Sequence, residues 1–227
     1  MSYLFAEPQT VLSLLVAHLE LVVVSLAAAL IIALPLGTLL ARRRVLRMPV
    51  LGVLGLIYTI PSLALMILLL PAFGLGGLTV IVALILYAQI ILVRNVVAGL
   101  DGVDASVLEA ARGMGMSGWE RWWRIEMPLA LPVILAGLRL AALSAIAIAT
   151  IGALFGAGGL GTLLFNGITE TRNDKIASGA FVLAALALAV NWGLVALERR
   201  FSVQGRVKRA TRRRDGSQEG GTGTATL

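Results

Sequence analysis

Residues 156–161, G-A-G-G-L-G, have the spacing of a cofactor motif, G-x-G-x-x-G. In a dinucleotide-binding unit this motif follows a β-strand, opens a helix and is followed about twenty residues later by an acid that binds the ribose. Here the run follows a long apolar segment, and the placement of Lys and Arg puts it on the outer side of a membrane, away from any nucleotide pool. We therefore expect a tight turn with close backbone packing, and no nucleotide site.

Groups that could do covalent or metal chemistry are scarce in the rest of the chain. It has one histidine, His18, and no cysteine, which excludes disulfides, thiol nucleophiles and sites rich in Cys or His. It has no P-loop G-x-x-x-x-G-K-[ST], no H-E-x-x-H and no plausible Ser–His–Asp set, so it cannot bind ATP through a P-loop. We expect no catalytic residue, no metal and no cofactor in this chain.

Glu20 is the one acid that falls well inside an apolar segment. Because a charge is costly to place inside a membrane, such a residue is a functional candidate. Its segment is overlong, however, so we favour the alternative of an interfacial or structural role near His18. A proton-driven carrier would use a relay of buried acids, and the absence of one favours energy supplied by another subunit.

The elements that must position these residues are membrane helices. Of the 227 residues, 59% are hydrophobic, which is too apolar for a soluble domain. Apolar segments long enough to span a bilayer lie at about 11–40, 49–70, 78–97, 131–155 and 176–197. We predict an all-α integral membrane protein with about five transmembrane helices. Its expected parts are an external segment at 1–10, a transmembrane domain at 11–200 and a basic, disordered tail at 201–227. The first residues lack a basic run, so we expect no cleaved signal.

The basic residues predict the orientation. Seventeen of the nineteen Lys and Arg residues fall on one side of these segments, including the run at 42–47, and only Arg172 and Lys175 fall on the other. Since cytoplasmic loops carry the excess of Lys and Arg, the N-terminus should lie outside and the C-terminus inside. The net charge of +7 then reflects topology, and we expect the tail to contact acidic membrane lipid and no nucleic acid.

One cytoplasmic stretch, 109–132, is dense in charges of both signs and reads E-A-A-R-G-M-G-M-S-G-W-E-R-W-W-R-I-E-M-P-L-A-L-P. Residues 109–111 suit the first turn of a short helix, and three glycines then bend the chain. The tryptophans at i, i+3 and i+4 share one face of a second helix. We expect Pro128 to end that helix and Pro132 to start the next. Such a helix–turn–helix favours a docking element, and an amphipathic surface connector is the alternative.

This stretch resembles the EAA loop of binding-protein-dependent ABC importer permeases. Their pattern is E-A-A, three residues, Gly, nine residues, Ile, one residue, Leu, Pro, and it maps onto this chain with only Met127 departing, in place of Leu. The resemblance implies coupling helices that sit in a groove of a cytoplasmic ATPase, which would hold the ATP and Mg. The ATPase-coupling residues it implies are Glu109, Ala110, Ala111, Gly115, Trp119, Ile125 and Pro128.

Further stretches resemble the permeases for glycine betaine, choline and carnitine. They are 60–65 (I-P-S-L-A-L), 86–88 (L-Y-A), 93–95 (V-R-N), 109–116 and 156–161, so the resemblance covers about residues 10 to 200. It implies an osmoprotectant permease domain in a bacterial cytoplasmic (inner) membrane. The implied partners are ATP-binding subunits, a second permease copy in a homo- or heterodimer, and an extracytoplasmic binding protein. The alternatives are a permease for another small solute such as methionine, an autonomous carrier or channel and, with least support, a membrane enzyme.

A translocation path is indicated by polar residues in apolar segments. Residues 58–62, Y-T-I-P-S, interrupt the second segment, either as a kinked packing helix or as a break that lines the path. The resemblance adds the glycine run, placed near the outer gate and the binding protein. The candidate path and gate residues are Tyr58, Thr59, Pro61, Ser62, Gln89, Asn95, Gly156, Gly158 and Gly159. No aromatic cluster is expected outside the cytoplasmic end, so a cation–π cage should belong to the binding protein.

Overall fold

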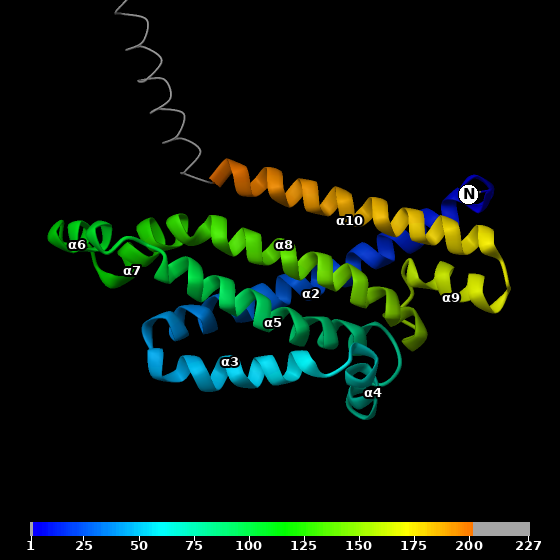
Figure 1. Cartoon of the computed structure of the whole chain (residues 1–227), viewed down its shortest axis with the longest axis horizontal. Helices are drawn as coiled ribbons and strands as arrows, with labels where there is room; N and C mark the ends of the chain where they lie inside the picture. The colour runs from blue at the N-terminus through cyan, green and yellow to red at the C-terminus, as the bar shows by residue number, and fades with distance from the viewer. Residues whose placement is uncertain (1, 202–227) are drawn as a thin grey trace, which may run out of the picture.

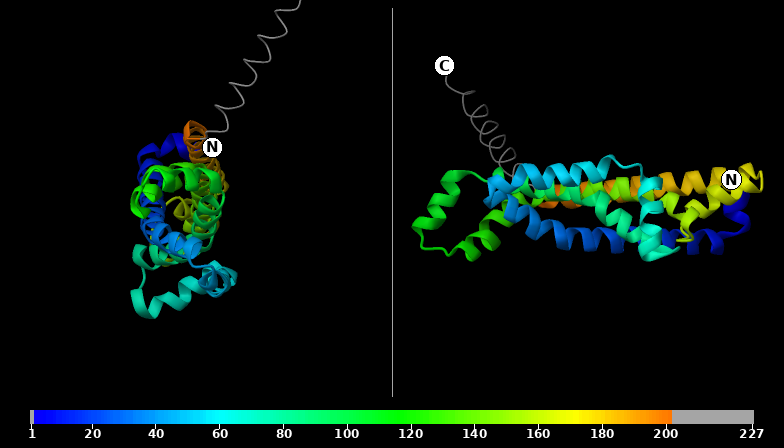
Figure 2. Two further views of the ribbon diagram at one scale, coloured as in Figure 1. Left: turned by 90° about the vertical axis from the view of Figure 1, so that its left-hand side faces the viewer. Right: turned by 90° about the horizontal axis from the view of Figure 1, so that it is seen from below.

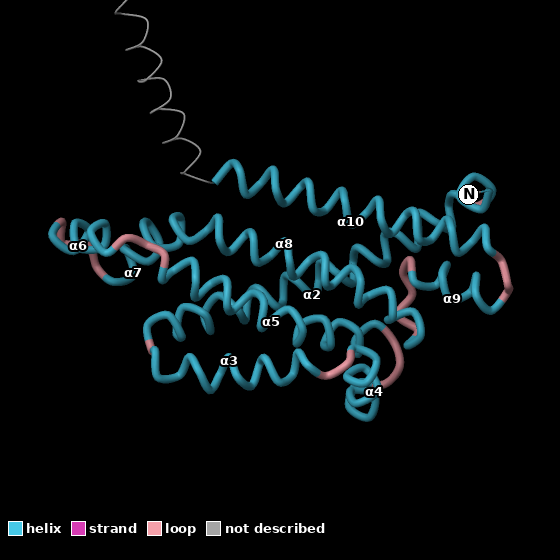
Figure 3. Tube along the Cα trace, viewed as in Figure 1, coloured by secondary structure: helices cyan, strands magenta, loops and turns pink. Residues whose placement is uncertain are grey.

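Four long helices dominate the structure, a computed structural model that describes residues 2–201 (Figure 1). No strand occurs among the described residues, and the loops between helices are short (Figure 3). The elements in order are α1 Ser2–Ala6, α2 Pro8–Arg42, α3 Arg44–Thr59, α4 Ser62–Phe73, α5 Gly77–Asp101, α6 Ala105–Gly113, α7 Gly118–Arg121, the π-helix η1 Trp122–Glu126, α8 Met127–Ile151, the 3-10 helix η2 Gly152–Phe155, α9 Gly161–Thr169 and α10 Asn173–Phe201. The tail predicted for 201–227 lies, from residue 202 on, outside the described residues.

The prediction of an all-helical chain with membrane spans is confirmed for these residues. Four helices are long and apolar enough to cross a bilayer: α2, α5, the continuous run Gly118–Phe155 and α10. The bent pair α3 and α4 makes a fifth candidate span. At 1.5 Å per residue, the 35 residues of α2 reach about 52 Å, which exceeds the ~30 Å hydrocarbon core.

The second predicted segment is broken more sharply than a kink. Helices α3 and α4 meet at 99°, with Ile60 extended at φ −65° and ψ 128° between them. Proline disfavours the helical region for the residue before it and lacks the N–H that would continue the helix. Pro61 therefore ends α3, and Ser62 starts α4 in a new direction.

The core lies where α2, α5 and α8 pack against one another. Small residues let their backbones approach closely, as is typical of membrane helices. A Cβ on Gly37 of α2 would lie 2.6 Å from Val96 of α5, and one on Gly99 of α5 would lie 2.9 Å from the Ala130 carbonyl oxygen of α8. Most of the α8 alanines are buried, which lets this helix pack closely: Ala130, Ala141, Ala142, Ala145 and Ala149.

The two ends of the bundle differ. At one end, α6 and α7 project beyond the long helices, close to the α2–α3 turn (Figures 1 and 2). Arg47 at that turn forms a 2.7 Å ion pair with Asp101 at the end of α5. The opposite end carries α1, α9 and the start of α10. There the Tyr3 ring lies 5.3 Å from the Arg172 guanidinium and 5.2 Å from the Lys175 ammonium, which ties α1 to α10.

Two boundaries differ from the expectations. Pro128 does not end a helix, because helix continues from Gly118 to Phe155 and Pro132 lies inside α8. The π-helix η1 precedes Pro128, and the Met127 N–H bonds to the Trp122 carbonyl oxygen at its end. The wider turn accommodates Pro128, so the helix continues past it. The connection expected between 156 and 175 also contains helix α9, Gly161–Thr169.

Candidate functional site

The projecting helices begin at a capped terminus. The Asp104 carboxylate accepts a hydrogen bond of 2.8 Å from the Ser106 backbone N–H, which satisfies a free donor in the first turn of α6. That backbone hydrogen bond, with a second from the Ser106 side chain, lowers the pKa of Asp104. Helix α6 thus starts at Ala105, so Glu109 lies in its middle and not in the first turn expected from sequence.

Replacing Asp104 with alanine should fray the start of α6, because the cap is lost. We expect faster hydrogen exchange at the Ser106 amide at pH 7, whereas Asp104→Asn, which keeps an acceptor oxygen, should exchange at nearly the wild-type rate. The depressed pKa means that the wild-type cap is present at neutral pH and is lost as the pH falls through that lowered pKa. Equal exchange in Asp104→Ala and wild type would contradict this capping role.

Gly115 ends α6 in a specific backbone motif. Its φ is +78°, the left-handed region that glycine adopts without strain. The Gly115 N–H bonds to the Arg112 carbonyl oxygen at 2.9 Å, and the Met116 N–H bonds to the Ala111 carbonyl oxygen at 3.2 Å. This is the paired 5→2 and 6→1 pattern of a Schellman cap. The turn between α6 and α7 therefore explains why a glycine follows E-A-A after three intervening residues.

The E-A-A residues on α6 differ in their exposure to solvent. Ala111 is fully buried, whereas Glu109, Ala110 and Gly115 are exposed. Further along, Ile125 is half-buried and Pro128 is exposed. The projecting segment 105–126, called the α6–α7 hairpin below, thus carries an exposed acid, an exposed small side chain and an exposed glycine on elements that stand away from the bundle (Figure 2).

The three tryptophans of the hairpin form one cluster, Trp119, Trp122 and Trp123, as their spacing predicts. The ring centroids of Trp119 and Trp122 lie 5.1 Å apart and those of Trp122 and Trp123 lie 5.6 Å apart. Trp119 and Trp123 are 72% and 62% exposed, which leaves a large aromatic surface for a membrane interface or a partner. Ser117 caps the helix that carries them, through a 3.2 Å bond from the Glu120 N–H.

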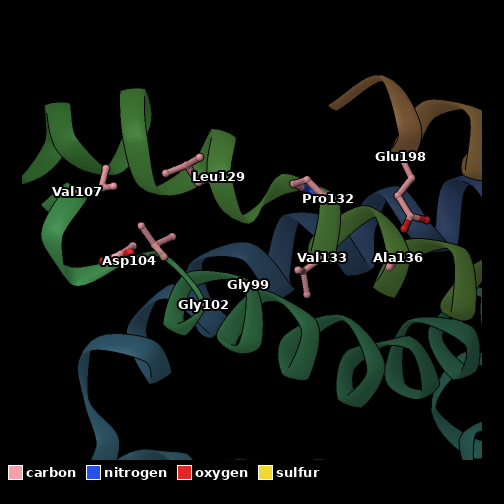
Figure 4. Close-up of a pocket in the computed structure, with 10 residues that line it drawn as sticks. Gly99, Gly102, Asp104, Val107, Leu129, Pro132, Val133, Ala136 and Glu198 are labelled. Atoms are coloured by element: carbon pink, nitrogen blue, oxygen red, sulfur yellow. The ribbon is translucent and has the colours of Figure 1, made fainter. Parts of the chain in front are cut away.

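A cavity of about 530 Å³ separates the hairpin from the bundle (Figure 4). Val107 of α6 faces it from one side, and Leu129 and Val133 of α8 line the other. Glu198 of α10 also lines it and lies 3.6 Å from Arg139. Because side chains do not fill this space, the hairpin rests on the bundle chiefly through its two ends.

Four of the predicted path residues meet at the break between α3 and α4. Tyr58, Thr59 and Pro61 are exposed and Ser62 is half-buried. The Tyr58 ring stands edge-on to Tyr87 of α5, with centroids 5.8 Å apart, and the Tyr87 hydroxyl donates a hydrogen bond to the Ile60 carbonyl oxygen. This aromatic pair was not expected from sequence, because the two tyrosines lie 29 positions apart in the chain.

Replacing Tyr87 with phenylalanine should weaken the break, because the Ile60 carbonyl loses its donor. A hydrogen bond of this kind contributes ~1 kcal/mol, so we expect the midpoint of thermal unfolding of the purified protein to fall by roughly 2–4 °C. Tyr58→Phe is the matched control, because the structure gives the Tyr58 hydroxyl no hydrogen-bond partner among the described residues. Equal midpoints for the two variants would contradict the proposed support of the break.

Gln89 and Asn95 lie elsewhere, between packed helices. Gln89 is 4% exposed, and its amide donates to the Ala29 carbonyl oxygen of α2 at 3.1 Å. Asn95 donates to the Ile91 carbonyl oxygen at 2.8 Å and fills the space opposite Gly137. The structure does not bring these two residues to the α3–α4 break. That they line the path remains a proposal, and it requires α5 to move.

The glycine run folds tightly against α2 and α8. Gly156, Gly158 and Gly159 have φ of +76°, +76° and +79°. A Cβ on Gly159 would lie 2.9 Å from His18 Nδ1, and one on Gly161 would lie 2.0 Å from the Thr150 carbonyl oxygen. The close backbone packing predicted for this turn is therefore present.

His18 joins three elements and was missed as a structural residue. It is completely buried, its Nε2 lies 3.2 Å from the Ile146 carbonyl oxygen of α8, and its ring faces Gly159. A lone polar residue in an apolar helix was the available signal. Glu20 is exposed and lies 22 residues from Arg42, about 33 Å along α2, which favours a place near the membrane boundary opposite to that of Arg42.

Comparison with known proteins decides the family. Residues 33–203 match the proteins described as binding-protein-dependent transport system inner membrane components. The chain belongs to this family. It is accordingly a multi-pass inner-membrane permease, and the family predicted from the E-A-A stretch is confirmed. The match spans every element from the end of α2 to α10.

This permease has curated relatives that it covers almost fully. It is 41% identical to the osmoprotectant import permease protein OsmW of Salmonella typhimurium, over 82% of this chain and 89% of that one. It is 40% identical to the carnitine transport permease protein OpuCB of Listeria monocytogenes, over 84% and 88%. It is 35% identical to the glycine betaine/carnitine/choline permease OpuCB of Bacillus subtilis, over 83% and 87%.

Solved structures support the fold of this permease. A chain of the inward-facing MetNI methionine ABC transporter superposes with a TM-score of 0.79 at 21% identity, over 87% of this chain and 98% of that one. A chain of an amino acid ABC transporter gives a TM-score of 0.67 at 20% identity. At these identities the likeness concerns the arrangement of helices alone.

Proposed function

We propose that this permease imports osmoprotectants of the quaternary-amine class, such as glycine betaine, choline or carnitine. The observation that carries the proposal is the 35–41% identity to three permeases named for these solutes or for osmoprotectants, each covered over more than 80% of its length. A permease for another small solute, such as methionine, is the second candidate, since the MetNI chain has the same fold.

The energy would come from partner subunits that hydrolyse ATP. We infer that these bind the α6–α7 hairpin, because it projects from the bundle and exposes Glu109, Ala110 and Gly115. The cavity of Figure 4 supports a hinged attachment, since it leaves room for the hairpin to tilt against α8. The excess of Lys and Arg at this end favours a cytoplasmic position, with the N-terminus outside and the C-terminus inside.

The solute path would run along the α3–α4 break, against a second permease copy. Exposure of Tyr58, Thr59 and Pro61 supports this placement, because a span that is bent by 99° leaves backbone groups that need either protein or a water-filled cavity. Of the Tyr58–Tyr87 pair only the Tyr58 ring is exposed, so a passing ammonium group meets one ring and no aromatic cage. High affinity would then belong to an extracytoplasmic binding protein near the glycine run.

The test is ATP hydrolysis in proteoliposomes that contain the permease and its co-expressed ATPase, with the binding protein added. Glycine betaine, choline, carnitine and methionine are supplied in turn. Stimulation by one or more quaternary amines and not by methionine is the expected result. Stimulation by methionine alone would support an importer but contradict the proposed class of solute. Failure of any ATPase to co-purify with the permease would reject the role of the α6–α7 hairpin.

A further inference from the structure

A groove of about 430 Å³ lies between the last turns of α2 and the tryptophan cluster. Leu34, Pro35 and Leu39 of α2 form its wall, Trp119 and Trp122 face them, and Arg42 stands at its end. The lining is therefore apolar along most of its length, with one cation at the edge. Neither the solute path nor the exposed face of α6 uses these residues.

The cation at the edge of the groove is uncompensated. Within residues 2–201, Arg42 has no acidic partner, and neither do Arg43 and Arg44, which follow it. The acids of the facing segment already have partners. Glu120 pairs with Arg124 at 2.8 Å, and Glu126 pairs with Arg121 at 3.2 Å. The groove thus presents positive charge to an anion from outside the chain.

Trp122 contributes apolar surface to the groove. Its indole Nε1–H is shielded from solvent and has no partner among the described residues, so this polar atom is not accessible from the groove. The lining that Trp122 and Trp119 provide is therefore aromatic carbon, which suits an acyl chain.

The exposed apolar face of α2 that continues from the groove has the length of one leaflet. Arg42 ends α2, and the exposed residues Leu39, Pro35 and Ile31 follow it up one face of the helix. Ile31 lies eleven residues from Arg42, about 16 Å along the axis, which is half of the ~30 Å hydrocarbon core. An acyl chain whose head group meets Arg42 would lie along this face.

We propose that the groove binds one anionic glycerophospholipid. Its phosphate pairs with Arg42, and one acyl chain packs on Pro35 and Leu39 and on the tryptophan rings. A second permease copy fits this place poorly, because a two-fold contact there would bring two runs of arginine together. The site does not depend on which solute the permease carries. A lipid held there touches both α2 and the hairpin, so its binding would link membrane composition to the position of the tryptophan cluster.

The experiment uses the full chain with Trp192→Phe, so that fluorescence comes only from the tryptophan cluster. The protein is reconstituted in phosphatidylcholine vesicles that contain the same small fraction of either brominated phosphatidylglycerol or brominated phosphatidylcholine. We expect the anionic lipid to quench with about fivefold higher apparent affinity. Arg42→Gln should remove this preference. Arg199→Gln, which takes the same charge from α10 outside the groove, should keep it.

Four outcomes would overturn the proposal. Equal quenching by the two lipids would show no anionic site, and a preference that survives Arg42→Gln would show diffuse attraction to the basic end. The absence of quenching by either lipid would show that protein covers the groove. Relief of quenching by millimolar glycerol phosphate would show a site for free phosphate and not for a lipid.

Discussion

Replacing Gly115 with valine should abolish coupled uptake while the permease still inserts into the membrane. Gly115 has φ +78° in the Schellman cap of α6, a conformation that costs roughly 1–3 kcal/mol for other residues and more for a β-branched one. Strain of that size shifts a conformational equilibrium by about 5- to 150-fold. The turn would open, and α6 would leave the direction that the ATPase recognises. Solute uptake and ATP hydrolysis measured in the same proteoliposomes check this.

The control for that variant is Gly113→Ala. Gly113 is the last residue of α6, its φ is not positive, and a Cβ there meets nothing within 4 Å. Alanine favours the helix at such a position, so uptake should stay at the wild-type level. Gly115→Asn should fall between the two, because asparagine tolerates the left-handed region. Wild-type uptake by Gly115→Val would mean that the cap does not position the coupling element.

Replacing Gly161 with alanine should produce the largest loss of stability among the glycine variants. The new Cβ would lie 2.0 Å from the Thr150 carbonyl oxygen and 2.8 Å from its carbonyl carbon. Backbone atoms cannot turn aside as a side chain can, so the end of α8 and the start of α9 must separate, at a cost of about 3 kcal/mol or more. The midpoint of thermal unfolding in detergent should fall by roughly 6–12 °C.

Two further glycine variants distinguish the loss of stability caused by a close contact from the loss caused by backbone strain. Gly158 has φ +76° but open space around its Cβ position, so Gly158→Ala should cost about 1 kcal/mol. Gly193 of α10 has neither constraint, so Gly193→Ala should leave the midpoint unchanged or slightly raised. An equal loss in Gly158→Ala and Gly161→Ala would mean that strain, and not the contact with Thr150, governs this turn.

The parts of the fold that sequence could predict are those set by local pattern. Runs of apolar residues gave the spans, the i, i+3, i+4 spacing gave the tryptophan cluster, and the E-A-A pattern located the hairpin before its geometry was known. The roles of its residues in coupling remain predictions. These features depend on neighbours within one or two turns of helix, which is the range that periodicity reports.

The features that sequence did not predict depend on distant contacts. The 99° bend needs Tyr87 of α5 to hold Ile60, and proline alone indicates only a kink or a stop. Helix α9 is short and glycine-bounded, and it persists because Leu163 is buried beside Val11 of α2. The structural role of His18 depends on its contact with the Ile146 carbonyl oxygen, more than a hundred positions away. No single-chain pattern encodes such pairs.

The π-helix at Trp122–Glu126 has a mechanical consequence. Because the π-helix accommodates Pro128, one continuous helix runs from Gly118 to Phe155. It has 38 residues and is about 57 Å long. One end of this rod holds the tryptophan cluster, and the other end holds Thr150 against Gly161. Its hydrogen-bond ladder is continuous, and the π-helix and the two prolines mark where it can bend. We expect the hairpin to tilt about this bend, and the part of α8 beyond it to carry the movement towards the glycine run.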